Sequence, residues 1–245
     1  MCFHTSQTKK VVELENRFKV DLYDDDARDA YDMPSYHLNG FAHPDMLIIP
    51  QEEPSILAIG RWGIAPSKTS PENLESYYKE SVSFGGGLNA QSEKLFNHFI
   101  YKHSALVRRC IVPVTGFFEP HEYKSKKYPY YIHRADDLSL GLAGLYTLVG
   151  DHLTFTILTK NASPMFAEIH NKKNRQPVIL KQEHEQDWLK DGLTDKDVRE
   201  LVNMQFNDDE LEAYTVSKDL FHPQVNSNVD TITSKVEYPE LATLF

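Results

Sequence analysis

The distribution of strand-like segments is the sequence feature that most restricts the fold of this chain. Short runs of β-branched and aromatic residues dominate the region from about residue 110 to residue 180. With two earlier runs, they are Met46–Ile49, Ile56–Trp62, Cys110–Val114, Tyr130–His133, Leu140–Leu148, Leu153–Thr159 and Pro177–Leu180. They do not alternate regularly with helical segments, as the strands of a parallel α/β sheet do. We therefore expect an α+β fold with a curved mixed or antiparallel sheet, or a barrel-like core, and peripheral helices.

Helical patterns are fewer and shorter. Val11, Leu14 and Phe18 recur at helical spacing and predict a first helix, before the acidic run Asp24–Asp26 opens a loop. Ser70–Glu72 predicts a helix start, because proline is tolerated in the first turn and an acid is favourable there. The glycine turn of FGGGLNAQSE is expected to lead into a further helix. Two later helices are predicted at Glu183–Lys190 and Asp195–Met204.

The length and composition favour one domain over residues 1–245. A chain of 245 residues with 40% hydrophobic content can bury one large core, and it contains no repeat, low-complexity tract or long linker. No segment approaches the roughly 20 apolar residues of a membrane helix, and the first residues lack the order of a secretory signal. We expect a cytoplasmic monomer without membrane contact. The two cysteines are too few for a disulfide framework.

The net charge of −10 is unevenly distributed. Residues 1–99 carry 9 basic and 15 acidic side chains, residues 100–175 carry 11 and 6, and residues 176–245 carry 6 and 15. Because salt screens charge over about 8–10 Å, a basic groove can hold DNA phosphates on an acidic protein. A solvated lysine-rich surface explains the charge equally well. The basic residues that flank the later motifs are Arg108, Arg109, Lys160, Lys172, Lys173 and Arg175.

The cysteine at position 2 is the most distinctive chemical feature. A small side chain at this position favours removal of Met1, which leaves Cys2 with a free amine beside a thiol. Such a group condenses with an aldehyde to an imine, and the thiol then closes a thiazolidine ring. An α-amino group with a pKa of about 7.8 is roughly 10–15% neutral at pH 7, against about 0.04% for a lysine. Alternatively, Cys2 acts as a thiolate nucleophile in acyl transfer.

Five segments in order resemble the SOS response-associated peptidase family. They are MCFH at the start, GRWGIAPS from Gly60, NAQSE from Asn89, RRCIVPVTGFFEP from Arg108, and ILTKNAS followed by EIHNKKNRQPVIL. The resemblance extends from Cys2 to the late segment TVSKDLFHPQVN. It implies a protein that crosslinks to abasic sites in single-stranded DNA, with DNA as the partner and neither a cofactor nor a metal.

The resemblance also implies a reactive set. Cys2 matches the reactive cysteine of the family, Asn89 the asparagine that orients the Cys2 terminus or the opened sugar, Glu119 the acid and His170 the histidine. Imine formation requires proton removal and proton delivery, which a carboxylate and an imidazole provide. We expect Glu119, at the end of an apolar strand, to have a pKa raised by desolvation and to act as acid and base at Cys2. His170 is expected to handle the sugar oxygen.

The implied DNA contacts are less well matched. They are Asn39, Pro66, Ser67, Gln91, Arg108, Thr159 and Arg175. Gln91 replaces an arginine that is usual in the family, and Ser67 and Lys68 stand where a tryptophan is common. His4 replaces the usual glycine-arginine opening, and Asn39 lies in a segment that matches only loosely. The departures therefore concentrate on phosphate and base-stacking contacts.

Three other functions compete with an abasic-site crosslinker. A thiol-dependent amidase or peptidase, acting on its own first residue, would use Cys2 as nucleophile and His170 as base. A metal site would combine Cys2, His4, Cys110 and His170, although no C-x-x-C or H-x-x-x-H spacing supports it. A noncatalytic single-strand binding module would bind reversibly, in a salt-dependent manner, and would not need Cys2.

Overall fold

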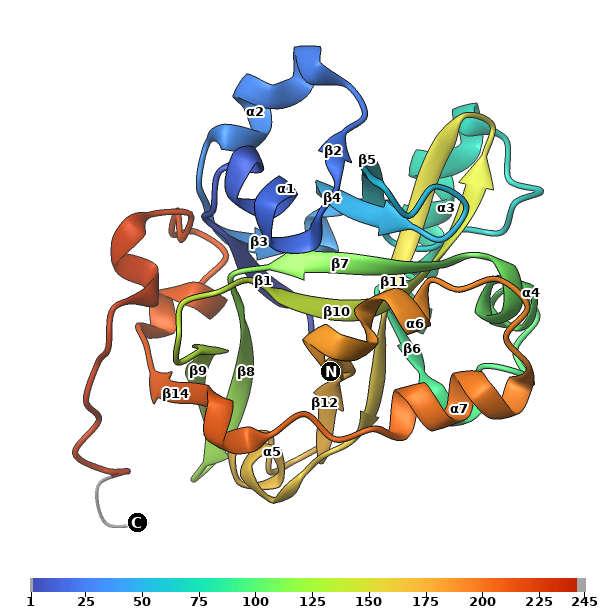
Figure 1. Ribbon diagram of the computed structural model, residues 1–245. Helices are drawn as coiled ribbons and strands as arrows, with labels where there is room; N and C mark the ends of the chain where they lie inside the picture. The colour runs from blue at the N-terminus through green and yellow to red at the C-terminus, as the bar shows by residue number, and fades with distance from the viewer. Residues whose placement is uncertain (1, 242–245) are drawn as a thin grey trace.

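Two β-sheets form the framework in the computed structural model, which describes residues 2–241 (Figure 1). The smaller sheet has the order β14-β9-β8-β1-β3, formed by Leu211–Thr215, Lys126–Arg134, Gly116–Tyr123, His4–Gln7 and Ser35–Asn39. The path of the larger sheet is β12-β11-β10-β7-β4-β5-β2, formed by Arg175–Pro177, His152–Asn161, Leu140–Val149, Arg109–Val114, Asp45–Pro50, Ile56–Trp62 and Asp21–Leu22. Off this path, β6 (Asn89–Gln91) pairs with β11, and β13 (Ile179–Leu180) pairs with β10.

Most strand pairs are antiparallel, but the larger sheet is mixed. β11 pairs in parallel with both β5 and β6, and β2 pairs in parallel with β5. In the smaller sheet, β1 lies between β3 and β8, with His4 opposite Asn39 on one side and Phe118 on the other. The strand that follows Cys2 is therefore held on both edges. The expected α+β fold with mixed sheets is confirmed.

The helices are short and lie around the outside of the sheets (Figure 1). They are α1 (Val11–Phe18), α2 (Arg28–Asp32), α3 (Leu74–Ser81), α4 (Tyr101–Val107), α5 (Pro164–Ile169), α6 (Glu185–Trp188) and α7 (Asp195–Asn203). In the described part of the chain, none of them combines the length and the apolar character that crossing a membrane requires. α1 buries Val11, Leu14 and Phe18, as their spacing predicts.

A large part of the core lies next to the start of the chain. Cys2 belongs to a cluster of buried apolar residues that includes Trp62, Phe117 and Phe155, and thus draws on both sheets. The indole nitrogen of Trp62 donates to the carbonyl of Leu88 at 2.9 Å, so the ring is buried without an unsatisfied donor. Cys2 is therefore part of the hydrophobic core.

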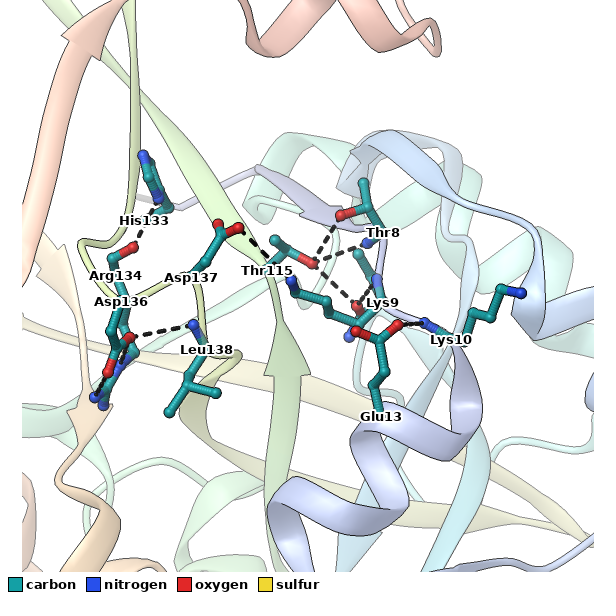
Figure 2. Close-up of polar contacts among 11 residues, drawn as sticks. Thr8, Lys9, Lys10, Glu13, Thr115, His133, Arg134, Asp136, Asp137 and Leu138 are labelled. Carbon is teal, nitrogen blue, oxygen red and sulfur yellow. Dashed lines mark hydrogen bonds and ion pairs between the residues drawn. The ribbon is translucent and has the colours of Figure 1, made fainter.

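The turn after β1 is fixed by hydrogen bonds to the strand junction between β7 and β8 (Figure 2). The backbone N–H of Thr8 donates to the Thr115 hydroxyl at 2.9 Å, and the Thr8 hydroxyl lies 3.3 Å from the same oxygen. The backbone N–H of Lys10 then donates to Glu13 at 2.9 Å, which caps α1. These contacts hold the C-terminal end of β1, whereas Cys2 lies before its N-terminal end.

Several predicted segments need correction. NAQSE does not begin a helix: Asn89–Gln91 forms β6, because it pairs with β11, and helix α4 begins at Tyr101. β8 was not expected as a full strand, and Glu119 lies within it rather than at a strand end. The predicted strand Pro177–Leu180 is divided between β12 and β13. The acidic run before α2 contributes to a 3₁₀ turn at Asp25–Ala27.

Arg109 and Lys160 are buried and serve the fold, unlike the phosphate-binding residues expected from the sequence. Arg109 has 0% exposure and donates to the carbonyls of Ala105, Leu106, Trp188 and Lys190. Lys160 donates to the carbonyls of Val202 and Met204 at the end of α7. Both cations thus satisfy carbonyl groups at helix ends.

Replacing Arg109 is expected to destabilise the protein strongly. Arg109→Leu removes the donors of four carbonyl contacts. We expect the free energy of unfolding to fall by about 3–4 kcal/mol, at roughly 1 kcal/mol for each lost hydrogen bond. Urea denaturation measures the loss. The matched control is Arg108→Leu, since Arg108 contacts Glu52 at 3.4 Å on the surface, and it should cost less than about 1 kcal/mol. Equal losses would contradict the assignment.

Candidate active site

Four residues expected to act together come from four different segments. Cys2 lies two residues before the start of β1, Asn89 begins β6, Glu119 lies within β8, and His170 follows α5. The structure brings them to one place through contacts between Asn89 and Cys2 and between Glu119 and His170. The negative charge of Glu119 also acts on the Cys2 thiol. The sequence pattern predicted these residues, and the strand pairs β1–β8 and β6–β11 position the segments that carry them.

Asn89 holds the backbone of Cys2. Its side-chain N–H donates to the Cys2 carbonyl at 2.8 Å. The approach depends on Gly87, which has a φ of +68° and lies so close to Ile64 that an added Cβ would be 2.4 Å from the Ile64 carbonyl oxygen. Only glycine fits this turn. The glycine-rich segment therefore sets the position from which Asn89 reaches Cys2.

Glu119 is a carboxyl group without solvent contact. Its exposure is 0%, and burial raises its pKa to about 7, as expected from the sequence. Near neutral pH the group is thus divided between its protonated and ionised forms. A carboxyl group in this range can take up and return a proton with little free-energy cost.

His170 contacts Glu119 as a neutral ring. Its Nδ1 lies 3.2 Å from Glu119 Oε2 and 2.9 Å from the carbonyl oxygen of Arg175. Burial lowers the pKa of His170 to about 4, so the contact with Glu119 is not a charged pair at neutral pH. Because a carbonyl oxygen only accepts, Nδ1 carries the proton and donates to Arg175. Nε2 is then the acceptor nitrogen of the ring.

The Cys2 thiol is buried and protonated. Its exposure is 0%, and Sγ lies 3.9 Å from the backbone carbonyl oxygen of His4. Burial raises the pKa of the thiol well above its usual range, and the charge of Glu119 raises it further. A thiol in this setting needs a base before it can act as a nucleophile.

An open pocket of about 760 Å³ reaches the reactive set at His170, whereas Cys2, Asn89 and Glu119 do not line it. His170 and Asn39, two residues expected at the site, contribute to its wall. Its cationic side chains are Lys127, Lys172 and Lys173, and Lys172 is paired with Glu122 at 2.7 Å. The wall also contains the aromatic rings of Phe3, Phe41, Phe118 and Phe221. The pocket thus offers positive charge and ring surfaces close to the reactive set.

The other expected DNA contacts have different positions. Arg175 forms an ion pair with Glu93 at 2.7 Å and donates a hydrogen bond to the backbone carbonyl of Thr159. Thr159 itself has 0% exposure. Gln91 lies opposite Thr159 in β6. Pro66 is half-buried and Ser67 is exposed, while Arg108 contacts Glu52 and does not line the pocket. The contacts of these residues with DNA stay predictions. Thr159 is fully buried and exposes no atoms to a ligand in this conformation.

Sequence reasoning missed several residues of the pocket. Phe3, His37, Lys127, Phe221 and Ser227 line it but were not among the expected site residues, although Phe3 and Phe221 lie in segments that resemble the family. The one available signal was His4, which departs from the usual opening and proves to contact His37 at 2.9 Å. Among residues 2–241, no three His, Cys, Asp or Glu side chains are grouped so that they could hold a metal ion.

Comparison with known proteins decides the family. The model of the family described as SOS response associated peptidase (SRAP) matches residues 1–223. The chain belongs to the SRAP family. The resemblance inferred from the five sequence segments is therefore confirmed.

Relatives of this SRAP protein are named for abasic sites. It is 28% identical to abasic site processing protein YoaM of Bacillus subtilis, with 86% of this chain and 94% of the relative covered. It is 29% identical to abasic site processing protein HMCES of Xenopus tropicalis, over 60% of this chain and 49% of the relative. A crystal structure from Bacteroides thetaiotaomicron matches with a TM-score of 0.83 and 27% identity, covering 96% of this chain and all of the other. One from Bordetella bronchiseptica has a TM-score of 0.70 and 26% identity, covering 88% of this chain and 100% of the other.

Three buried histidines should make this protein sensitive to mild acid. Burial lowers the pKa of His4 to about 3 and those of His37 and His170 to about 4. Between about pH 4 and 6.5 the unfolded chain binds protons on these rings that the folded chain does not, so the free energy of unfolding falls as the pH falls. Glu119 acts in the opposite direction between pH 4.5 and 7, because only the folded state retains its proton there.

The net difference is about two protons, three on the histidines against one on Glu119. We expect the free energy of unfolding to fall by about 2.7 kcal/mol per pH unit between pH 6 and 5, at about 1.36 kcal/mol for each proton. Urea denaturation at several pH values measures the slope. His37→Gln removes one titrating ring and should lower the slope by about half. A stability independent of pH in this range would contradict the burial of the rings in neutral form.

Proposed function

We propose that this SRAP protein captures the ring-opened aldehyde of an abasic site in single-stranded DNA through the amine and thiol of Cys2. The observation that carries the proposal is the convergence of Cys2, Asn89, Glu119 and His170, of which His170 lines an open pocket. The relatives named abasic site processing proteins support the choice of lesion. Met1, which must be removed first, lies outside the described residues.

The proposed reaction proceeds in two steps. The Cys2 amine adds to the aldehyde carbon, and loss of one water gives an imine. The Cys2 thiol then adds to the imine carbon while its proton passes to the nitrogen, which closes the thiazolidine. One water leaves in total, and the reaction requires no oxidant or reductant.

Glu119 is suited to move the protons of both steps. A carboxyl group with a pKa of about 7 accepts a proton from the ammonium and returns it to the departing hydroxyl. It also provides the base that the protonated Cys2 thiol lacks in its buried position. Asn89 holds the Cys2 backbone during both steps through its bond to the carbonyl. The neutral His170 ring, with Nε2 as acceptor, receives the proton of the sugar hydroxyl during ring opening.

DNA binding is proposed to use the pocket and its cationic rim. Lys127 and Lys173 offer charge to the phosphates. The rings of Phe3 and Phe41 are tilted against each other with centroids 4.8 Å apart, and Phe41 is 49% exposed. An abasic nucleotide has no base to unstack, so presenting its sugar to the pocket costs little free energy. A single strand is favoured because its backbone can follow a local groove while its bases stack on rings.

The competing peptidase function has less support. A thiol-dependent peptidase needs a thiolate, whereas burial and Glu119 raise the pKa of the Cys2 thiol. We therefore restrict any hydrolysis to the release of Met1.

A denaturing gel tests the covalent step. The protein is incubated with a single-stranded oligonucleotide that carries one abasic site, and we expect a shifted band for the wild type. Cys2→Ala and a chain that retains Met1 both offer a terminal amine without an adjacent thiol on the same residue, so any imine should give only a labile band. An undamaged oligonucleotide is the control. The absence of a stable band with the wild type would rule out the proposal.

The role of Glu119 is tested by Glu119→Gln, which keeps the shape of the side chain but cannot exchange a proton. We expect adduct formation to slow by about 10²–10⁴-fold, the range for loss of a general acid or base. The residual rate should lose the inflection near pH 7 that the wild type shows. The variant Glu80→Gln, at an exposed position that does not line the pocket, is the control and should react at the wild-type rate. An unchanged rate with Glu119→Gln would exclude proton transfer by this carboxyl.

A further inference from the structure

A chain of three hydrogen-bonding side chains begins two residues after Cys2. His4 Nδ1 lies 2.9 Å from His37 Nε2, and His37 Nδ1 lies 2.6 Å from the hydroxyl oxygen of Ser227. The three residues come from β1, β3 and the C-terminal segment 217–234, which are far apart in the sequence. None of them belongs to the reactive set described above.

The C-terminal segment fixes His37 through its backbone as well as its ring. The side-chain oxygen of Asn228 accepts from the backbone N–H groups of Tyr36 and His37, at 2.8 and 3.2 Å. β3 is the edge strand of the smaller sheet, so these bonds satisfy N–H groups of an open edge. Ser227 and Asn228 lie beyond residue 223, where the match to the family model ends. The contacts of Ser227 and Asn228 with β3 therefore lie outside the part of the chain that the family model matches.

The His4 ring is placed where a ligand of the reactive set would meet it. The Cys2 side chain packs into the buried apolar cluster with Trp62 and Phe117, whereas the His4 ring faces the pocket. His4 and His170 both line the pocket. The His4 ring is otherwise held by rings, with centroids 5.0 Å from His37 and 5.5 Å from Phe221. His37 is the polar contact that determines which ring atoms of His4 face the pocket.

We propose that His37 is a positioning residue for the reaction at Cys2: it orients the His4 ring toward the sugar and its phosphates, and Ser227 and Asn228 hold His37 in place. This inference rests on the proposed function. Because the Ser227 hydroxyl both donates and accepts, the chain of hydrogen bonds can run in either direction. His4 then presents either a donor or an acceptor nitrogen to the sugar, in the same fixed orientation.

Two substitutions of His37 separate positioning from structure. The amide nitrogen of His37→Gln reaches the place of Nε2 and keeps the contact with His4. The amide of His37→Asn reaches the place of Nδ1, so it keeps the contact with Ser227 and loses that with His4. The initial rate of adduct formation is measured against the concentration of abasic single-stranded DNA, which gives the rate at saturation and the half-saturating concentration.

We expect His37→Asn to lower the rate at saturation by about 10-fold or more, with the half-saturating concentration unchanged, as displacement of a reacting group does. His37→Gln should restore the rate to within about 3-fold of the wild type, since the His4 contact is kept. Ser227→Ala, in the exposed segment, should give a smaller loss in the same direction. His152→Asn, on a surface away from the pocket, is the matched control.

The outcomes are distinct. Equal rates for His37→Asn and the wild type, or equal losses for His37→Asn and His37→Gln, would contradict the positioning role while the wild type still forms its adduct. If His37→Asn does not fold, an unchanged rate for Ser227→Ala would contradict it instead. A wild type that forms no adduct would contradict the proposed function itself.

Discussion

Burial of the Glu119 carboxyl is the constraint on which the site depends. The group lies within β8, next to β1, and solvent does not reach it. A carboxyl placed there tends to keep its proton, since ionisation without water is costly. Two neighbours are buried as well, and their own burial keeps the Cys2 thiol protonated and the His170 ring neutral. The same burial that makes Glu119 costly to the fold makes it able to exchange protons near neutral pH.

The fold supplies this environment by enclosing the chain start. β1 is paired on both edges, and the turn after it is bonded to Thr115. Asn89 then holds the Cys2 carbonyl from the larger sheet. A chain terminus is usually mobile unless it is tied down in this way. Here the contacts that tie it down come from the same segments that carry the chemistry, so folding and assembly of the site are one event.

The basic residues show that position in the fold decides whether a cationic side chain stabilises the fold or is available to a ligand. Arg109 and Lys160 lie in the basic third of the sequence, yet both bind carbonyl groups at helix ends. Lys127 and Lys173 line the pocket and offer charge to a ligand. Sequence position does not distinguish the two groups, because exposure depends on which strands and helices cover each side chain.

The amino-acid sequence was sufficient to predict the fold class and the family, because these depend on local pattern and on residue type. The roles of Cys2, Asn89, Glu119 and His170 stay predictions. The sequence also predicted the raised pKa of Glu119, since an acid among apolar residues is desolvated wherever the strand is buried. It failed where pairing between distant segments decides the outcome: NAQSE became β6 through its contact with β11, and Thr159 became buried. The contacts of His37 with His4 and with Ser227 were likewise fixed only by the tertiary structure, because nothing local to the sequence relates residues 33 and 190 positions apart.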